Sequence, residues 1–94
     1  MINPFEMMKN IQEMKNLMAQ IKCTGYSMGN MVQVVASGEL KIESIKIDPS
    51  LVKEGQEGLL EVLVTSAVNS AFEAVREKLL EEAKKMGGRY GVSL

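Results

Sequence analysis

The sequence predicts an α+β fold: one helix, a three-stranded antiparallel sheet and a second, much longer helix. Three observations support this prediction. Apolar residues recur at helical spacing over about 4–22 and again over about 56–86, and the stretch between them alternates with a period of two. Asp48-Pro49 marks a break before the second helix. Because the chain has 94 residues, we expect a single domain over 1–94.

The first helix is expected over about residues 4–22. Asn3 can cap its N-terminus, and Pro4 suits its first position because the missing N–H is not needed there. Its main apolar side chains follow one another at spacings of 4, 3, 4 and 3 residues, a period of 3.5 that is typical of a coiled-coil seam. The members of this seam are Met7, Ile11, Met14, Met18 and Ile21.

Three short strands are expected between about residues 23 and 47, joined as a meander by glycine-containing turns. Alternation over residues 32–36 places valines and an alanine on one face. Between Ile42 and Ile45 the alternation slips by one residue, which predicts a β-bulge or a twist near Glu43-Ser44. A turn over 48–55 follows, since proline cannot donate to a strand ladder.

The long helix is expected over about 56–86, ending before Gly87-Gly88, with residues 87–94 as a tail. At about 1.5 Å per residue it is roughly 45 Å long. A three-stranded sheet is only about 14 Å wide, and a seven-residue strand is about 23 Å long. The sheet therefore cannot cover the whole apolar stripe of this helix.

A second copy of the chain would cover the remainder. Four or five large apolar side chains left in water would forgo roughly 6–12 kcal/mol of burial. We therefore expect a homodimer with projecting helical arms, the alternative being a compact monomer with a bent or shortened long helix. The core or dimer candidates are Met7, Ile11, Met14, Met18, Ile21, Val64, Val68, Phe72, Val75 and Leu79. Asn69, among small apolar residues, is expected to be a buried amide against the core that bonds strand backbone or its own mate across a dimer axis. The alternative is contact with a ligand or nucleic acid.

The composition argues against an enzyme. The chain has no histidine and one cysteine, which excludes Ser-His and Cys-His nucleophiles and ordinary zinc sites. No phosphate-binding loop is present, so no cofactor, metal or small-molecule substrate is expected. The start lacks a signal-peptide pattern, and no apolar run approaches 18 residues. We therefore expect a cytoplasmic protein with no membrane partner.

Charge is distributed unevenly along the chain, although the net charge is only −1. Residues 23–75 are acidic, whereas residues 1–22 and 76–94 each carry a small excess of lysine and arginine. If the two ends converge, they form a local positive patch that can contact phosphates. The DNA-binding candidates are Lys9, Lys15, Lys22, Arg76, Lys78, Lys84, Lys85 and Arg89.

Several segments form an ordered set between Gly25 and Ala71. They are the strand "VQV" ending in Ser37-Gly38, the strand end Ile47-Asp48-Pro49-Ser50-Leu51, and Ala67-Val68-Asn69-Ser70-Ala71 on the long helix. This set, with the methionine- and glutamine-bearing first helix, resembles the YbaB/EbfC family of bacterial nucleoid-associated proteins. The chain departs from that family in its reduced turn "GYSMGN", in Glu61-Val62-Leu63 and in its short tail.

The resemblance implies a helix, three strands and a helix in an intertwined homodimer shaped like tweezers. It also implies DNA binding at the nucleoid, with an effect on nucleoid organisation or gene expression, and no enzymatic activity. Because no base-reading helix is evident, contacts mainly to phosphates with limited sequence specificity are expected. The alternative function is a protein-interaction or assembly adaptor that uses the methionine-rich seam of the first helix.

Overall fold

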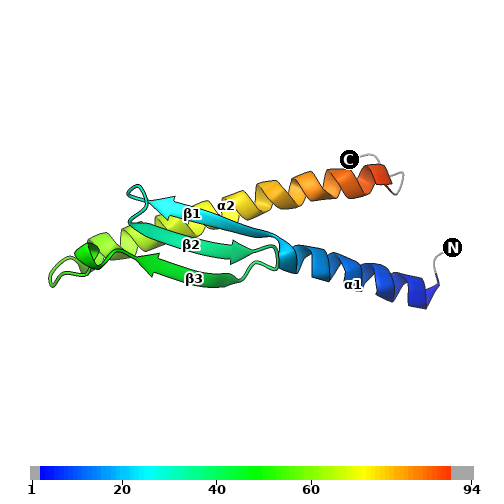
Figure 1. Cartoon of the computed structure of the whole chain (residues 1–94), viewed down its shortest axis with the longest axis horizontal. Coiled ribbons are helices and arrows are strands. Elements are labelled where there is room, and N and C mark those ends of the chain that lie inside the picture. Colours follow the sequence, from blue (N-terminus) through cyan, green and yellow to red (C-terminus); the bar gives the residue numbers. More distant parts are fainter. Residues whose placement is uncertain (1–2, 90–94) are drawn as a thin grey trace.

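The computed structural model describes residues 3–89, with side chains up to Lys85. Its elements, in chain order, are α1 (Pro4–Gln20), β1 (Lys22–Ser27), β2 (Val32–Ser37), β3 (Ile42–Ile47), the short 3-10 helix η1 (Pro49–Leu51) and α2 (Glu57–Arg89) (Figure 1). The strands form one antiparallel sheet in the order β1-β2-β3. This arrangement confirms the predicted α+β class.

The core lies between one face of the sheet and α2, which packs mainly on β1 and β2. The inward side chains of β2 are fully buried, as the alternation over residues 32–36 predicts. They meet Ala67, Ala71 and Val75 of α2, which are also fully buried. The buried hydroxyl of Ser27 is satisfied because it donates a 2.6 Å hydrogen bond to the carbonyl of Leu63.

Gly25 in β1 allows the closest approach between the sheet and α2. A Cβ at this position would overlap the backbone of Ala67 and Ala71, so no larger residue fits without moving the helix. The alanines on the helix and the glycine on the strand therefore form one close contact, which explains why such small residues recur there.

The predicted bulge is confirmed in β3. Val35 pairs with Ser44, but the next pair joins Ala36 to Ile42, so Glu43 has no partner in the ladder. The extra residue restores the alternation, because paired residues of neighbouring strands share a face. As a result Ile42 and Ile45 both lie on the face that carries α2.

Helix α1 extends from the sheet and contributes nothing to the core. Asn3 caps it, with Oδ1 accepting a 2.8 Å hydrogen bond from the Glu6 N–H. It ends at Gln20, two residues before the expected end, because Ile21 is already extended and Lys22 begins β1. No residue of α1 is buried. Its base is held by Gly38, whose N–H donates a 2.9 Å hydrogen bond to the Ile21 carbonyl.

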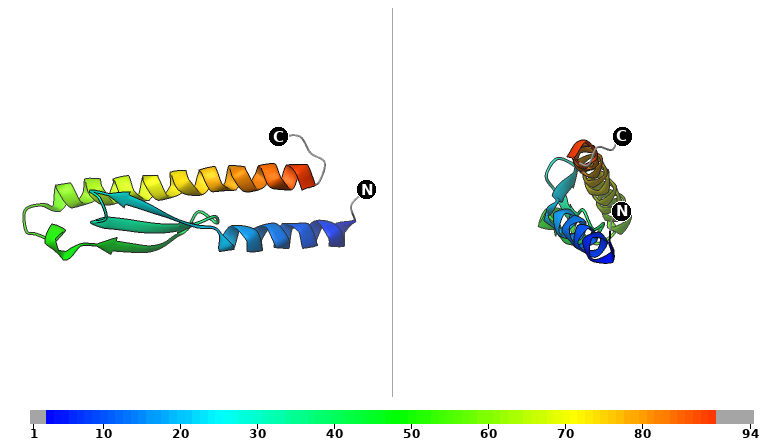
Figure 2. Two further views of the ribbon diagram at one scale, coloured as in Figure 1. Left: turned by 45° about the horizontal axis from the view of Figure 1, so that its top comes forward. Right: turned by 90° about the vertical axis from the view of Figure 1, so that its right-hand side faces the viewer.

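Helix α2 has 33 residues and is therefore about 50 Å long. It was expected to end before Gly87-Gly88, and this was wrong, since it continues through both glycines to Arg89. A glycine costs a helix only about 1 kcal/mol relative to alanine and does not forbid helical geometry. Both α1 and the later part of α2 extend from the same end of the sheet (Figure 2).

Candidate nucleic-acid interface

The two basic ends of the sequence become two helical arms that point in the same direction (Figure 2). The α1 arm is the whole of α1, and the α2 arm is residues 76–89, beyond the last fully buried residue, Val75. Lys9 and Lys15 lie exposed on the α1 arm. The α2 arm carries most of the other predicted DNA-binding residues: Arg76, Lys78, Lys84, Lys85 and Arg89.

The side of α2 that packs on the sheet changes from apolar to charged residues where the sheet ends. Ala71 and Val75 are buried, and continuing at spacings of 3 and 4 residues the same side carries Lys78, Glu82 and Lys85. This side of the α2 arm faces the α1 arm, because the sheet and α1 lie on the same side of α2 (Figure 2). Charged side chains therefore line the inner side of the α2 arm.

Ion pairs hold several of these cations. Lys78 Nζ lies 3.7 Å from Glu81 Oε2 and 3.8 Å from Glu82 Oε1. Lys85 Nζ lies 3.8 Å from Glu81 Oε1 and 3.5 Å from Glu82 Oε1. All four pairs join residues of one helix, and such pairs typically contribute only about 0.3–0.5 kcal/mol each where they are exposed, although the Glu82 side chain is only 21% exposed. Phosphate oxygens can therefore replace these glutamates at little cost.

The remaining candidate cations divide into those without an ion pair, those with one, and Arg89. Lys9, Lys15 and Lys84 are exposed and have no ion-pair partner among the described side chains. Arg76 pairs with Glu73 at 3.5 Å, and Lys22, at the base of the α1 arm, pairs with Glu43 at 3.2 Å. Arg89 is the last residue of α2, and its side chain lies outside the described ones.

The apolar seam of α1 has almost no partner within the protomer. Met7 is 54% exposed, and Ile11 and Met14 are nearly as exposed. Only the base of the seam is covered, where Met18 is half-buried and Ile21 is buried. Most of the stability of a helix in a protein comes from packing of its apolar side, and the single protomer leaves most of the apolar side of this helix exposed.

A second uncovered apolar surface lies on β3. Ile42 and Ile45 are 42% and 45% exposed, although they lie on the same face of the sheet as the core. They are exposed because α2 covers β1 and β2 and leaves this strand at the open side. Neither residue is among the predicted core or dimer candidates, because only the position of α2 shows which strand stays open.

The α2 candidates for core or dimer contact all reach the core. Val75 is fully buried, and four others are partly buried and pack against the core cluster. These four are Val64, Val68, Phe72 and Leu79. The outer side of α2 also exposes apolar residues, among them Val62 and Leu80.

α2 is more apolar than the expected absence of any apolar run of about 18 residues would suggest. Over Glu57–Lys85 it contains an 18-residue window with a mean hydropathy of 1.3, so length and composition alone would allow it to span a membrane. Only 17% of that window is buried in the protomer. A mostly buried core helix also passes this test of length and composition, and one side of α2, with Ala67 and Ala71, does pack on the sheet.

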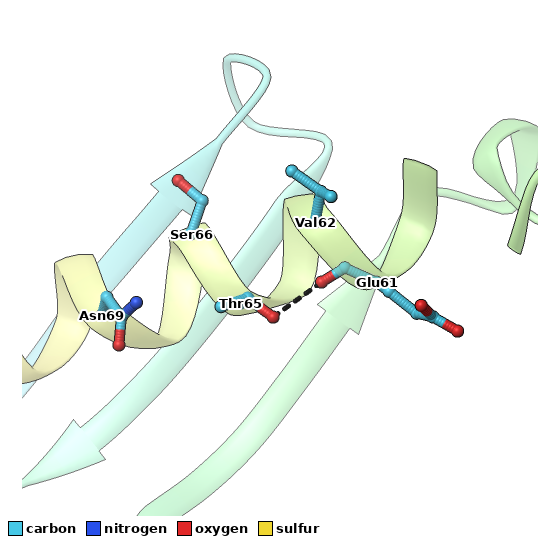
Figure 3. A pocket seen from close by; sticks show the side chains of 5 residues that line it. All are labelled: Glu61, Val62, Thr65, Ser66 and Asn69. Atoms are coloured by element: carbon cyan, nitrogen blue, oxygen red, sulfur yellow. Dashed lines mark hydrogen bonds between the residues drawn. The ribbon is translucent and has the colours of Figure 1, made fainter. Parts of the chain in front are cut away.

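Asn69 lies on the outer side of α2 and is exposed, so the expectation that it packs against the core of its own protomer was wrong, whereas a bond to its mate across a dimer axis stays a prediction. At about 100° per residue it is turned about 200° from Ala67, which faces the sheet. Together with its neighbours it lines a shallow depression of about 600 Å³ (Figure 3). The lining residues are Glu61, Val62, Thr65, Ser66 and Asn69. The Thr65 hydroxyl donates within the helix, to the Glu61 carbonyl at 2.8 Å.

The match to a family model decides the family. The model described as the YbaB/EbfC DNA-binding family matches residues 2–90. The chain belongs to the YbaB/EbfC family. This confirms the resemblance seen in the sequence, and it places the chain in a family described as DNA-binding rather than in a family of enzymes.

Nucleoid-associated proteins from several bacteria are similar to the chain. A nucleoid-associated protein of Mesorhizobium japonicum, mlr5504, is 36% identical over 86% of this chain and 76% of its own length. One of Dictyoglomus thermophilum is 32% identical over 93% of this chain and 88% of its own. The crystal structure of the uncharacterized protein HP0035 from Helicobacter pylori shares the fold, with a TM-score of 0.68 and 26% identity over 85% of this chain and 93% of that one.

Proposed function

We propose that this protein is a nucleoid-associated DNA-binding protein that acts as a homodimer in the bacterial cytoplasm and affects nucleoid organisation or gene expression. In this proposal the arms contact mainly the phosphate backbone of duplex DNA, with limited sequence specificity. The observation that carries the proposal is the change along α2, from buried Ala71 and Val75 over the sheet to Lys78 and Lys85 on the side that faces the α1 arm. The family description and the names of the relatives agree with it.

Phosphate contact follows from the kind of side chains on the arms. Lysine presents a single flexible ammonium group, which binds phosphate oxygens as a point charge and reads no base pattern. Lys9 and Lys84 are available directly, whereas Lys78 and Lys85 must exchange Glu81 and Glu82 for phosphate. Binding should therefore be weak at high salt and similar for different sequences.

The homodimer explains both uncovered apolar surfaces at once. The seam of the α1 arm needs a partner, and Ile42 and Ile45 form an apolar strip beside α2 that a helix can cover. In the proposed dimer, α1 of one protomer lies over this strip of the other. Covering one large aliphatic side chain contributes roughly 1.5–3 kcal/mol, so several such contacts suffice for a stable dimer.

Duplex binding is tested by fluorescence anisotropy with labelled duplexes of unrelated sequence, over a range of salt concentrations. We expect similar affinities for all duplexes and a steep loss of affinity as salt rises. The Lys84→Glu/Lys85→Glu variant should bind all of them more weakly, and Lys53→Glu, an exposed lysine away from the arms, is the control. No binding at low salt and micromolar protein would contradict the proposal.

The oligomeric state is tested by light scattering coupled to size exclusion. We expect a particle of twice the 10.4 kDa of one chain. A particle of 10.4 kDa whose circular dichroism shows both helices fully formed would overturn the dimer and leave DNA binding to be judged separately.

A second candidate function, a protein-interaction adaptor, is supported by the exposed methionines of α1. Met7, Met8 and Met14 are all exposed, and methionine adapts to varied partners. Hydrogen exchange distinguishes the two functions. If α1 amides and methionines are protected in the purified protein, a second copy covers the seam. If the α1 amides exchange freely and the α1 methionines are readily oxidised by added peroxide while the protein is dimeric, the seam is available to another protein.

A further inference from the structure

The sheet has a second face, opposite α2, on which no helix of residues 3–89 packs (Figure 2). In β1, Gly25 and Ser27 point toward α2 and are buried, so Thr24 and Tyr26 point the other way. This outer face is distinct from the apolar strip of Ile42 and Ile45, which lies on the α2 side. The proposed dimer contact therefore leaves the outer face free.

Three side chains form a row across this outer face. Tyr26 pairs with Gln33, and Gln33 pairs with Lys46, so an aromatic ring, an amide and an ammonium group lie on adjacent strands. Strands lie about 4.8 Å apart, which places the two ends of the row about 10 Å from each other. Tyr26 is 47% exposed. Lys46 is exposed and has no ion-pair partner among the described side chains.

A second row lies beside the first and is also mostly polar. Thr24 pairs with Val35, and Val35 pairs with Ser44, so two hydroxyls flank one half-buried valine. The Gln33 amide uses one N–H for the Asn30 carbonyl at 3.2 Å and keeps its oxygen available. The outer face therefore offers one ring for stacking, several hydrogen-bonding groups and one unpaired positive charge.

We propose that this outer face binds an unpaired stretch of nucleic acid, with a base stacked on Tyr26 and the backbone phosphate contacting Lys46. A base offers a flat ring and a negative phosphate at distances that match this row, and exposed aromatic rings on sheets are suited to unstacked bases. A duplex does not fit, since its bases are already stacked on one another. A protein partner is disfavoured because the face has no large aliphatic side chain to anchor it.

This surface is separate from the arms, which take duplex DNA through phosphates. The two sites differ in what they recognise: the arms respond to charge alone, whereas the outer face requires an exposed base. Loss of one should leave the other intact, so the two proposals can fail independently.

Tyrosine fluorescence provides a direct test. The chain has no tryptophan and two tyrosines, Tyr26 and Tyr90, so Tyr90→Phe leaves Tyr26 as the only tyrosine emitter. Titration of this variant with oligothymidylate should quench its emission in a saturable way, because a stacked base quenches the ring. A duplex of the same length, and an abasic strand with the same phosphates, should quench it far less.

Substitutions then separate stacking from charge. Tyr26→Leu should weaken oligothymidylate binding about fivefold or more, whereas Tyr26→Phe should preserve it. Lys46→Gln should weaken it and reduce its salt dependence, whereas the control Lys53→Gln should not. Circular dichroism of each variant checks that the fold is retained.

Three outcomes would overturn the inference. One is the absence of saturable quenching by oligothymidylate at low salt. Another is unchanged single-strand affinity in folded Tyr26→Leu. The third is an equal loss of duplex and single-strand binding in that variant, which would mean that Tyr26 belongs to the duplex surface. If the parent protein binds no duplex, the arm proposal alone fails. Quenching by oligothymidylate should then still be seen, also in the Lys84→Glu/Lys85→Glu variant.

Discussion

Both helices of this chain carry an apolar side, yet they differ in where that side is covered. The first part of α2 packs so closely on β1 that Gly25 has no room for a methyl group. The α1 seam, with Met7 and Ile11 exposed, is covered in its own protomer only at its base. The difference shows that helical periodicity identifies an apolar face but does not tell whether that face belongs to the core or to an interface.

The strongest test of this comparison acts on the packed side. Gly25→Ala places a methyl group against the backbone of Ala67 and Ala71, which cannot move without shifting α2. We expect the free energy of unfolding to fall by about 3 kcal/mol, the upper part of the usual range for overpacking. Urea unfolding at a fixed protein concentration measures it. The control is Gly58→Ala, where nothing lies within 4 Å of the added Cβ. Equal midpoints for Gly25→Ala and the parent would contradict the close contact.

The next test acts on the uncovered side. Ile45→Glu and Met14→Glu each place a charge in the proposed contact between α1 and the partner's sheet. Since each removes about 1.5–3 kcal/mol of burial, the dimer dissociation constant should rise at least about tenfold. Sedimentation over a range of concentrations measures this rise. Val62→Glu, on the outer side of α2, should leave dimerisation unchanged. An effect of Val62→Glu alone would move the interface to that side.

A smaller effect is expected on the inner side of the α2 arm. Glu81→Gln/Glu82→Gln releases Lys78 and Lys85 from their ion pairs, so duplex DNA should bind severalfold more tightly. If both lysines then gain a phosphate, the slope of log affinity against log salt should steepen by up to about two units. Glu54→Gln, in the turn before α2, is the control. Unchanged affinity would mean that these lysines do not meet DNA.

The smallest effect is expected at the turn between the sheet and α2. Asp48 Oδ1 accepts a 2.9 Å hydrogen bond from the Ser50 N–H, and hydrogen bonds from Ser50 lower the pKa of this carboxyl below its usual value of 3.8. A carboxyl whose pKa is lower in the folded than in the unfolded state stabilises the fold at pH values above its unfolded-state pKa. This stabilisation is lost as the pH falls through the folded-state pKa. Asp48→Ala should therefore be slightly less stable than the parent at neutral pH, with the difference lost as the pH falls through the lowered folded-state pKa of Asp48. Thermal unfolding at several pH values measures it.

Much of the fold is readable in the sequence because local rules decide it. Asn3-Pro4 starts α1, the slip between Ile42 and Ile45 predicts the bulge, and Asp48-Pro49 ends β3. Each of these depends on only a few neighbouring residues. The exposure of Ile42 and Ile45 could not be predicted in this way, because it depends on which strands α2 crosses.

Two errors have different causes. The glycines after Met86 predicted a helix end, but their cost of about 1 kcal/mol each is too small to stop a helix by itself. Asn69 was placed in the core because its neighbours are small and apolar. The helical angle between Ala67 and Asn69, about 200°, already indicates the opposite side, so the sequence held that signal. For the candidate DNA-binding residues, the sequence supplies the identities, and the common direction of the two arms appears only in the fold.

The attachment of α1 through its base alone has a mechanical consequence. The hydrogen bond between the Gly38 N–H and the Ile21 carbonyl acts as a pivot, and the 17 residues beyond it form a lever about 25 Å long. A rotation of roughly 10° at the pivot displaces the tip by about 4 Å. The distance between the tips of the α1 arm and the α2 arm is therefore set by whatever contacts α1, which in the proposed assembly is the neighbouring subunit.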